Sequence, residues 1–430
     1  DIDDMVGPDI CDRAGCPVRR PDRYARLGNV SDVLDEPFAP EHRADPHPIY
    51  HRLRAESPIR FFEESDSFLC TRWEDCNAVL GNTGFSSNPA TARRDVPEDS
   101  TSLRDQLAAS GDVNTLLFLD PPDHTRIRRI FHRLFTPRAV ERLRVHAETI
   151  VEQRLDQLLG AGPFDMVHDF GFHLPVTIIS ELVGVPEDDR EMLGPWSADA
   201  SRSLDGDLLT AEELEVCMMA FMQLLNYFNG LIEERTTQRG DDLLSHLLTL
   251  RDEGAVLSDE ELRANIILLF VAGHETTTNL IGNGVWALLD HHDQWDRLVS
   301  EPSLAPSAVE EVLRFDGPVH LTGRIATDAV QVGDVTVDPG QSVTTLLAAA
   351  NRDPEVFPDP DRFDIGRADN HHLTFSHGAH YCLGASLARL EGQVALEALA
   401  RRAPDLQVLE EPRYREHFIL RGLEALQVQS

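Results

Sequence analysis

Lysine is absent from the sequence, so all 39 basic residues are arginines, and they are outnumbered by 74 aspartates and glutamates. The resulting formal net charge of −35 makes nucleic acid and anionic membranes poor partners, because both repel an acidic protein. Cysteine is also scarce: six in a chain of 430 residues are too few for a disulfide framework and fit a reducing cytosol. We therefore expect a cytoplasmic protein, and we give little weight to a metal or redox role for Cys11 and Cys16.

Long hydrophobic runs, Gly/Ser-rich linkers and internal repeats are missing as well. No apolar segment reaches the length of a transmembrane helix, and the first seven residues are acidic rather than signal-like. What is present is helical patterning from 139 to 290, with strand-like segments at 59–71 and 330–347. Residues 330–337 alternate around a two-residue turn at Gly333 and Asp334, which predicts a hairpin. The pattern predicts a mainly α fold with a small β region.

A single cysteine, Cys382, stands in the glycine-punctuated segment 375–384, directly before a predicted helix over 385–400. Orphan N–H groups and the helix dipole favour a thiolate there, so we expect a lowered pKa. One thiolate suits haem iron, because the macrocycle supplies the four equatorial nitrogens, whereas zinc needs several clustered side chains. His377 and His380 keep zinc open as an alternative, and a buried structural cysteine is another.

A second informative stretch runs from Ser258 to Asp290 without proline and opens with the capping box Ser258–Glu261. Its apolar middle, 266–273, gives way abruptly to the polar segment 274–278. Threonine hydroxyls can bond back to carbonyls one turn earlier, and Gly273 weakens the helix, so we expect a local bulge or kink. The alternative is a buried helix whose polar residues satisfy one another.

The spacing of Phe375, Gly378, His380, Cys382 and Gly384 resembles the haem-binding signature of the cytochrome P450 family. The resemblance implies that Cys382 is the axial ligand of the iron of haem b, that His380 meets a propionate, and that Phe375 packs beside the sulfur. Gly378 and Gly384 would let the backbone turn tightly and approach the flat cofactor. The fold implied is a helix-rich body around a buried haem, with one catalytic domain over 38–430 and a poorly ordered tail over 1–37.

Further motifs match the family in order along the chain. Ala272, Gly273, Glu275 and Thr276 match the oxygen-activation groove, in which the acid and the hydroxyl relay protons. A scaffolding triad and a set of propionate ligands complete the match: Glu311, Arg314 and Arg362 for the triad, and His124, Arg128 and Arg324 with His380 for the propionates. At each of these positions the alternative is an ordinary surface charge or helix ion pair.

The segment 126–144 holds seven arginines against one acid. We expect Arg126, Arg129 and Arg133 to form a positive patch that docks an acidic ferredoxin. The resemblance implies that electrons reach the patch from NAD(P)H through a ferredoxin reductase, and we expect a monomer. A solvated helix face is the alternative interpretation.

By resemblance, the substrate pocket draws on the loop after Gly84, on 196–228, and on Phe270, Gly273, Val319, His320, Thr322, Phe418 and Ile419. Its apolar residues indicate a bulky, mostly hydrophobic molecule, free or carrier-bound. The expected reaction uses O₂ and two electrons to hydroxylate or epoxidise that molecule, in bacterial secondary metabolism or catabolism. A peroxide-driven haem peroxygenase and a non-catalytic haem sensor or carrier are the alternatives.

Overall fold

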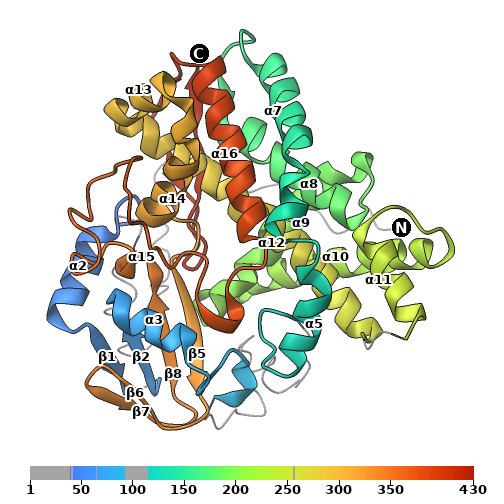
Figure 1. Cartoon of the computed structure of the whole chain (residues 1–430). Helices are drawn as coiled ribbons and strands as arrows, with labels where there is room; N and C mark the ends of the chain where they lie inside the picture. The colour runs from blue at the N-terminus through green and yellow to red at the C-terminus, as the bar shows by residue number, and fades with distance from the viewer. Residues whose placement is uncertain (1–38, 40–41, 64, 93–114, 255–256) are drawn as a thin grey trace, which may run out of the picture.

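The computed structural model describes residues 39, 42–63, 65–92, 115–254 and 257–430. Helices make up most of the body, and a small sheet lies to one side of it, beneath α2 and α3 in the view of Figure 1. This arrangement confirms the predicted mainly α fold. The predicted tail over 1–37, with Cys11 and Cys16, lies outside the described residues, as does part of the loop after Gly84. The single domain over 38–430 stays a prediction.

The α-helices fall into three groups along the chain. The first group precedes the long central helix: α2 (His47–Glu56), α3 (Trp73–Gly81), α5 (Asp123–His132), α6 (Pro137–Glu141), α7 (Arg144–Leu158), α8 (His173–Val183), α9 (Arg190–Ser201), α10 (Ala211–Thr237) and α11 (Leu243–Asp252). The central helix is α12 (Asp259–Asp290). The last group is α13 (His292–Ser300), α14 (Ala305–Asp316), α15 (Leu347–Ala350) and α16 (Ala385–Arg402). Short 3₁₀ turns include η4 (Arg202–Leu208) and η6 (Gly378–His380), and η2 (Met166–Gly171) is a π-helix.

The main sheet has five strands in the order β1-β2-β8-β5-β3, and only β2 and β8 pair in parallel. Its strands are β1 (Ile59–Phe62), β2 (Ser67–Cys70), β3 (Phe85–Ser86), β5 (Leu321–Ala326) and β8 (Ser342–Leu346). The hairpin predicted in 330–347 is β6 (Val330–Val332) with β7 (Val335–Val337), and Gly333 takes the positive φ of 50° that its tight turn requires. The remaining short strands are β4 (Phe164–Asp165), β9 (Gln407–Val408), β10 (Arg413–Tyr414), β11 (Leu423–Ala425) and β12 (Gln427–Gln429).

Helix α12 crosses the middle of the molecule (Figure 1) and joins two hydrophobic cores. Its N-terminal half packs Ile266 and Phe270 into one core, with α8 to α11, and its C-terminal half packs Leu280 and Val285 into the other, with α7, α14 and α16. The polar segment 274–278 therefore lies where one core gives way to the other. Because each half of the helix packs into a hydrophobic core, this segment is held at the centre of the protein.

The structure corrects the expected kink, because α12 is α-helical without interruption from Asp259 to Asp290. The predicted back-bond does form: Thr276 Oγ1 donates to the carbonyl of Ala272 at 3.1 Å. Gly273 serves close helix packing instead of opening a gap. A Cβ there would lie 2.6 Å from the side chain of Ile179, so glycine lets α12 approach α8.

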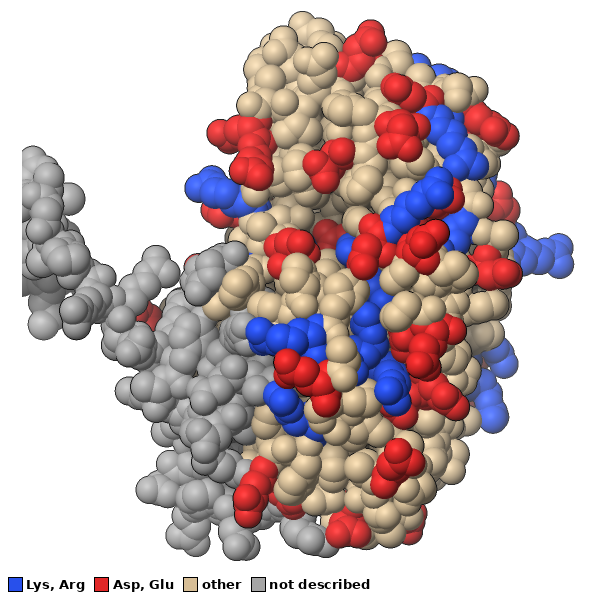
Figure 2. All heavy atoms as spheres, turned by 90° about the vertical axis from the view of Figure 1, so that its left-hand side faces the viewer, with Lys and Arg blue, Asp and Glu red and all other residues tan. Residues whose placement is uncertain are grey.

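Charged side chains of both signs are interleaved on the face around α2 and α13, which Figure 2 shows. Arg297 and Asp364 lie 2.9 Å apart, and Arg352 and Asp361 lie 3.3 Å apart. Ion pairs of this kind place the arginine charges next to carboxylates, which reduces the local negative charge of the surface. Within the described ranges, every helix is too short or too polar to span a lipid bilayer.

The capping box at the start of α12 gives a test of this fold. Ser258 Oγ accepts from the Glu261 N–H at 3.1 Å, and Glu261 accepts from the Ser258 N–H at 2.8 Å. Ser258→Ala should lower the free energy of unfolding by about 1 kcal/mol, measured by denaturant titration, because one N–H of the first turn loses its acceptor. Ser303→Ala, at an exposed serine, is the control. Equal stability of the two variants would contradict the capping role.

Candidate active site

The Cys382 loop is positioned by its own backbone and by α3. The Cys382 N–H donates to the carbonyl of Phe375 at 2.8 Å, and α16 begins three residues after the cysteine. Gly378 has a φ of 72°, and a Cβ there would lie 2.7 Å from the carbonyl oxygen of Leu80 in α3. Glycine is therefore required at 378 by packing on α3, which differs from the predicted approach to a cofactor. Gly384 has an ordinary φ of −85° at the N-cap of α16, so its conformation does not require glycine.

The thiol of Cys382 has a raised pKa, because burial outweighs every group that favours the thiolate. Those groups are the backbone N–H groups of Gly384 and Ala385 and the guanidinium groups of Arg128 and Arg389. The predicted lowering of this pKa is wrong for the free thiol. The N–H groups at the helix start nevertheless favour a negatively charged sulfur, which is the form that ligates a metal.

An ionic network that the sequence did not indicate supports Phe375. The Arg389 guanidinium carbon lies 4.5 Å from the centroid of the Phe375 ring, and Glu310 accepts from Arg389 Nε at 2.6 Å and Nη2 at 3.0 Å. Burial opposes ionisation of Glu310, but hydrogen bonds from His372 and Arg389 lower its pKa to about 2. A cation therefore lies over the face of Phe375 and is itself held by the partly buried carboxylate of Glu310.

The four residues predicted to meet the propionates are brought together by α5, β5 and η6. The rings of His124 and His380 lie 4.3 Å apart, and Arg128 Nη2 donates to the Tyr381 carbonyl. Within the described ranges, no carboxylate lies within 4.0 Å of the buried Arg324 guanidinium. His124 Nε2 is buried without a hydrogen-bond partner in the structure.

The electrostatics of this cluster favour a bound anion, although the carboxylate of Asp120 already acts on His124 and Arg324. Burial lowers the pKa of Arg324 to about 10. Burial, together with Arg324, His124 and Arg128, lowers the pKa of His380 to about 3. Buried positive groups that repel one another are stabilised by a negative ligand, and two propionates supply such charges. The residues present therefore fit haem at this place.

On α12, Ala272 is exposed although Phe270 and His274, on either side of it, are completely buried. Thr276 lies one turn further along the same face and is half-buried. An exposed side chain in the middle of a central helix indicates open interior space beside it. Among the described residues, no three His, Cys, Asp or Glu side chains gather as they would at a zinc site, so the zinc alternative has no ligand set there.

Glu275 is buried next to Thr276 and held from two sides. Arg415 Nη1, from the segment after β10, donates to Glu275 Oε2 at 3.1 Å, and His274 Nε2 lies 3.4 Å from Oε1. Burial alone would raise the pKa of Glu275, but the close approach of His274 and the charges of Arg415 and His417 outweigh it and lower the pKa. Arg415 was missed from the sequence, because a lone arginine 140 residues away has no local signal.

The structure replaces one member of the predicted triad. Glu311 and Arg314 are both completely buried, and their two hydrogen bonds are each 2.8 Å long. The third cation is Arg367, whose Nε lies 3.1 Å from Glu311 Oε2. Arg362 is wrong as a triad member: its side chain is 65% exposed. Only its backbone carbonyl takes part, accepting from Arg314 and Arg367 where the chain turns back toward Glu311.

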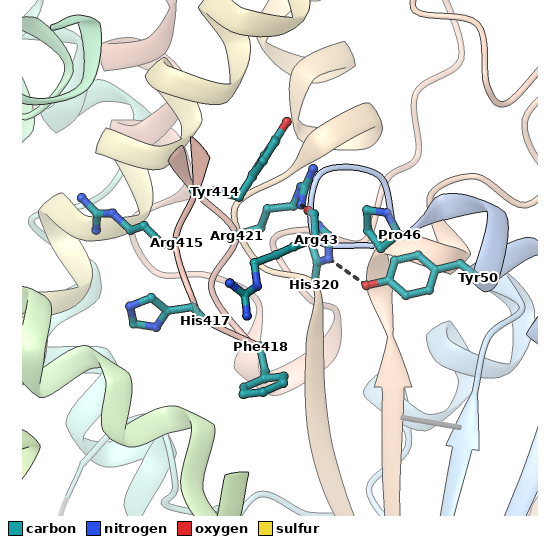
Figure 3. Close-up of a pocket in the computed structure, with 10 residues that line it drawn as sticks. Arg43, Pro46, Tyr50, His320, Tyr414, Arg415, His417, Phe418 and Arg421 are labelled. Atoms are coloured by element: carbon teal, nitrogen blue, oxygen red, sulfur yellow. Dashed lines mark hydrogen bonds between the residues drawn. The ribbon is translucent and has the colours of Figure 1, made fainter. Parts of the chain in front are cut away.

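Two predicted pocket residues point elsewhere. Phe270 has no exposed surface and packs on the rings of Phe228 and His274, so it belongs to the core. His320 is buried and its Nδ1 lies 3.1 Å from the hydroxyl of Tyr50 on α2, as Figure 3 shows.

The other predicted pocket residues lie along β5 and the chain end. Phe418 lines the same pocket as His320. Val319 pairs with Leu420 in an isolated bridge, Ile419 accepts from the His320 N–H, and the Thr322 carbonyl accepts from Thr345. The roles of these residues toward a substrate stay predictions.

The predicted arginine patch also changes. Arg126 pairs with Glu261 and with Asp123, so its inclusion as a free cation is wrong. Arg129 and Arg133 are exposed on α5 and at its end, as are Arg138 and Arg142 on and after α6, and no ion pair of these four is found within the described residues. The exposed arginines of this segment without an ion pair among the described residues are therefore Arg129, Arg133, Arg138 and Arg142, and their grouping into a docking patch stays a prediction.

The corrected triad can be tested by comparing two arginines. Arg367→Ala should lower the free energy of unfolding by about 2 kcal/mol, because it removes a charged hydrogen bond from a buried carboxylate. Arg362→Ala is the matched control and should be close to neutral. Denaturant titration of both variants measures the difference, and a larger loss in Arg362→Ala would restore the original triad.

Known proteins resemble this chain over nearly its whole length. The family model of cytochrome P450 matches residues 95–402. Cytochrome P450 107B1 of Saccharopolyspora erythraea is 41% identical over 410 residues, which cover 93% of this chain and 98% of that protein. The cytochrome P450 monooxygenase PikC of Streptomyces venezuelae is 40% identical over 406 residues and 92% of each chain.

A solved structure gives the same result for the fold. P450BioI, in complex with an acyl carrier protein ligated to hexadec-9Z-enoic acid, matches with a TM-score of 0.83 and 38% identity, over 91% of this chain and 99% of that one. The matched residues include the Cys382 loop, α12 and the cation cluster. The chain therefore belongs to the cytochrome P450 family of haem-dependent monooxygenases.

Proposed function

We propose that this protein oxidises a bulky, mostly hydrophobic small molecule with O₂ and two electrons from a ferredoxin. The observation that carries the proposal is the group of His124, Arg128, Arg324 and His380 beside Cys382, in which the buried Arg324 has no carboxylate partner and His124 Nε2 has no hydrogen-bond partner among the described residues. In the proposal, Cys382 would ligate the haem iron, and the two arginines together with the two histidines would hold the propionates. Haem with a thiolate ligand supplies oxygen activation when bound.

In this proposal, Glu275 and Thr276 deliver protons. The Thr276 hydroxyl is half-buried and donates its proton to the Ala272 carbonyl, so it delivers this proton to a group in the interior space next to Ala272 by rotating away from that carbonyl. Glu275 is kept ionised by Arg415 and His274, so it is ready to accept a proton and pass it on. A buried acid and a hydroxyl on one helix turn are needed for proton delivery and are not needed by a haem carrier or a peroxide-driven enzyme.

The substrate is proposed to be a product of secondary metabolism, hydroxylated or epoxidised either free or on a carrier. Support comes from the named relatives, one of which is the monooxygenase PikC and another a complex with an acyl carrier protein. Val319, Thr322, Phe418 and Ile419 are proposed contacts, since β5 and the chain end meet there.

Electrons are proposed to enter through the patch of Arg129, Arg133, Arg138 and Arg142. Its position supports this, because Arg128 on the same helix, α5, contacts the carbonyl of Tyr381, the residue before Cys382. An acidic ferredoxin, reduced by NAD(P)H through its reductase, is the complementary partner.

Proton delivery is tested with Thr276→Ala. The variant should still bind substrate, seen as a spectral shift of the haem, but should divert electrons from product into hydrogen peroxide. The ratio of peroxide formed to NAD(P)H consumed, with a surrogate ferredoxin and reductase, is the measurement. Thr236→Ala is the matched control, because Thr236 makes the same back-bond on the exposed face of α10. Unchanged coupling in Thr276→Ala would refute the relay, and product formation from peroxide alone at the same rate would favour the peroxygenase.

The docking patch is tested by charge reversal. Arg129→Glu with Arg133→Glu should slow reduction by ferredoxin at low ionic strength, and added salt should shrink the difference. Arg401→Glu is the control, since this arginine is 54% exposed near the other end of α16, about 24 Å along the helix from its start. The measurement is the stopped-flow rate of reduction by ferredoxin. If Arg401→Glu slows this reduction equally, the patch is not the docking site.

A further inference from the structure

The segment between β10 and β11 contacts Glu275 on α12 and also contacts η4, the short connection between α9 and α10. The strands β10 and β11 form a hairpin, and Arg415 follows β10 directly. Arg415 is fixed in this hairpin by its N–H to the Gly422 carbonyl at 3.0 Å and by its Nε to the Leu423 carbonyl at 3.2 Å. The arginine that pairs with Glu275 therefore moves only if the hairpin moves.

The tip of this hairpin is held by a single buried carboxylate. Asp205 Oδ1 accepts from the N–H groups of Phe418 at 3.1 Å and Ile419 at 3.0 Å, and its Oδ2 lies 3.4 Å from His417 Nδ1. The Asp205 side chain is only 1% exposed. A carboxylate buried to this degree costs stability unless it is hydrogen-bonded, so the two hydrogen bonds from Oδ1 to the tip make a specific anchor, whereas the approach of His417 to Oδ2 is an ion-pair contact without a hydrogen bond.

Asp205 lies in η4, the short connection between α9 and α10. Within η4, Gly206 leaves the helical conformation, with φ 58° and ψ −123°. Arg415 and His417 project to the same side of the segment in Figure 3, away from Tyr50, and Arg415 extends toward α12. A continuous set of polar contacts thus runs from η4 through the hairpin to the middle of α12.

We propose that Asp205 is a positioning residue for proton delivery: by anchoring the hairpin tip it keeps Arg415 against Glu275 and couples the α9–α10 connection to that acid. The inference rests on the proposed role of Glu275 as a proton relay. Phe418 and Ile419, the anchored residues, are also proposed substrate contacts. A substrate that displaces the tip would therefore loosen Arg415 and free Glu275 to exchange protons.

Two variants of Asp205 separate anchoring from charge. Asp205→Ala removes every acceptor at the tip, whereas Asp205→Asn keeps the Oδ1 acceptor for the Phe418 and Ile419 N–H groups. In the holoenzyme, hydrogen exchange of peptides covering 415–422 should rise several-fold in Asp205→Ala and stay close to the parent in Asp205→Asn. Glu233→Ala is the control, because it removes an exposed carboxylate from α10. Unchanged exchange in Asp205→Ala would overturn the anchor.

Coupling to the acid is tested with Arg415. Asp205→Ala and Arg415→Ala should each raise the peroxide formed per NAD(P)H several-fold, and the double variant should be no worse than Arg415→Ala, because both act through one contact. Additive effects, or unchanged peroxide yield despite faster exchange, would overturn the proposal. Glu275→Gln distinguishes a failure of the proton relay from a failure of the positioning role. If Glu275→Gln leaves coupling unchanged, the relay itself is wrong. If coupling is lost in Glu275→Gln but not in Asp205→Ala, only the positioning role is refuted.

Discussion

The architecture around the cysteine depends on the buried ion pair of Glu311 and Arg314. Arg314 uses its remaining N–H groups on the carbonyls of Asn351, Pro360 and Arg362, so one guanidinium fixes the main chain at three places. Glu311 in turn accepts from the Asp364 N–H and from Arg367. Removing one partner of such a pair typically costs about 3–5 kcal/mol, because the other charge is left buried and unpaired. The chain that leads to Cys382 is therefore held by an ion pair, and the loss of either partner alone would destabilise it.

The interior charges are divided between two sides of the site. Around Cys382, the guanidinium groups of Arg128 and Arg324 lie with the imidazoles of His124 and His380, and the guanidinium of Arg389 lies over Phe375. At α12, by contrast, a carboxylate, Glu275, is stabilised by Arg415 and His274. The first group suits a ligand with negative charges, and the second suits a step that consumes protons.

Local sequence signals predicted the local structure well. The capping box at Ser258, the β6–β7 turn at Gly333 and the helix after Cys382 depend on neighbours within a few residues, and all are confirmed. The cation cluster was also found, through the family resemblance. The failures involve long-range contacts, because a side chain's partner across the fold is not encoded by its neighbours.

Three particular residues show this limit. Arg362 and Arg367 lie in one loop, and only the turn of that loop decides which one reaches Glu311. His320 turns toward Tyr50 on α2, which is 270 residues away. Arg415 reaches Glu275 through a hairpin whose strands have only two and three residues, too short for a strand pattern.

The central claim, a haem held by the Cys382 thiolate, is tested most directly by the carbon monoxide difference spectrum of the purified, dithionite-reduced protein. The account predicts the strongly red-shifted Soret band that thiolate ligation produces. A band at the unshifted position typical of histidine ligation would contradict the role of Cys382, and the absence of haem from protein supplied with it would contradict the assignment of the whole site.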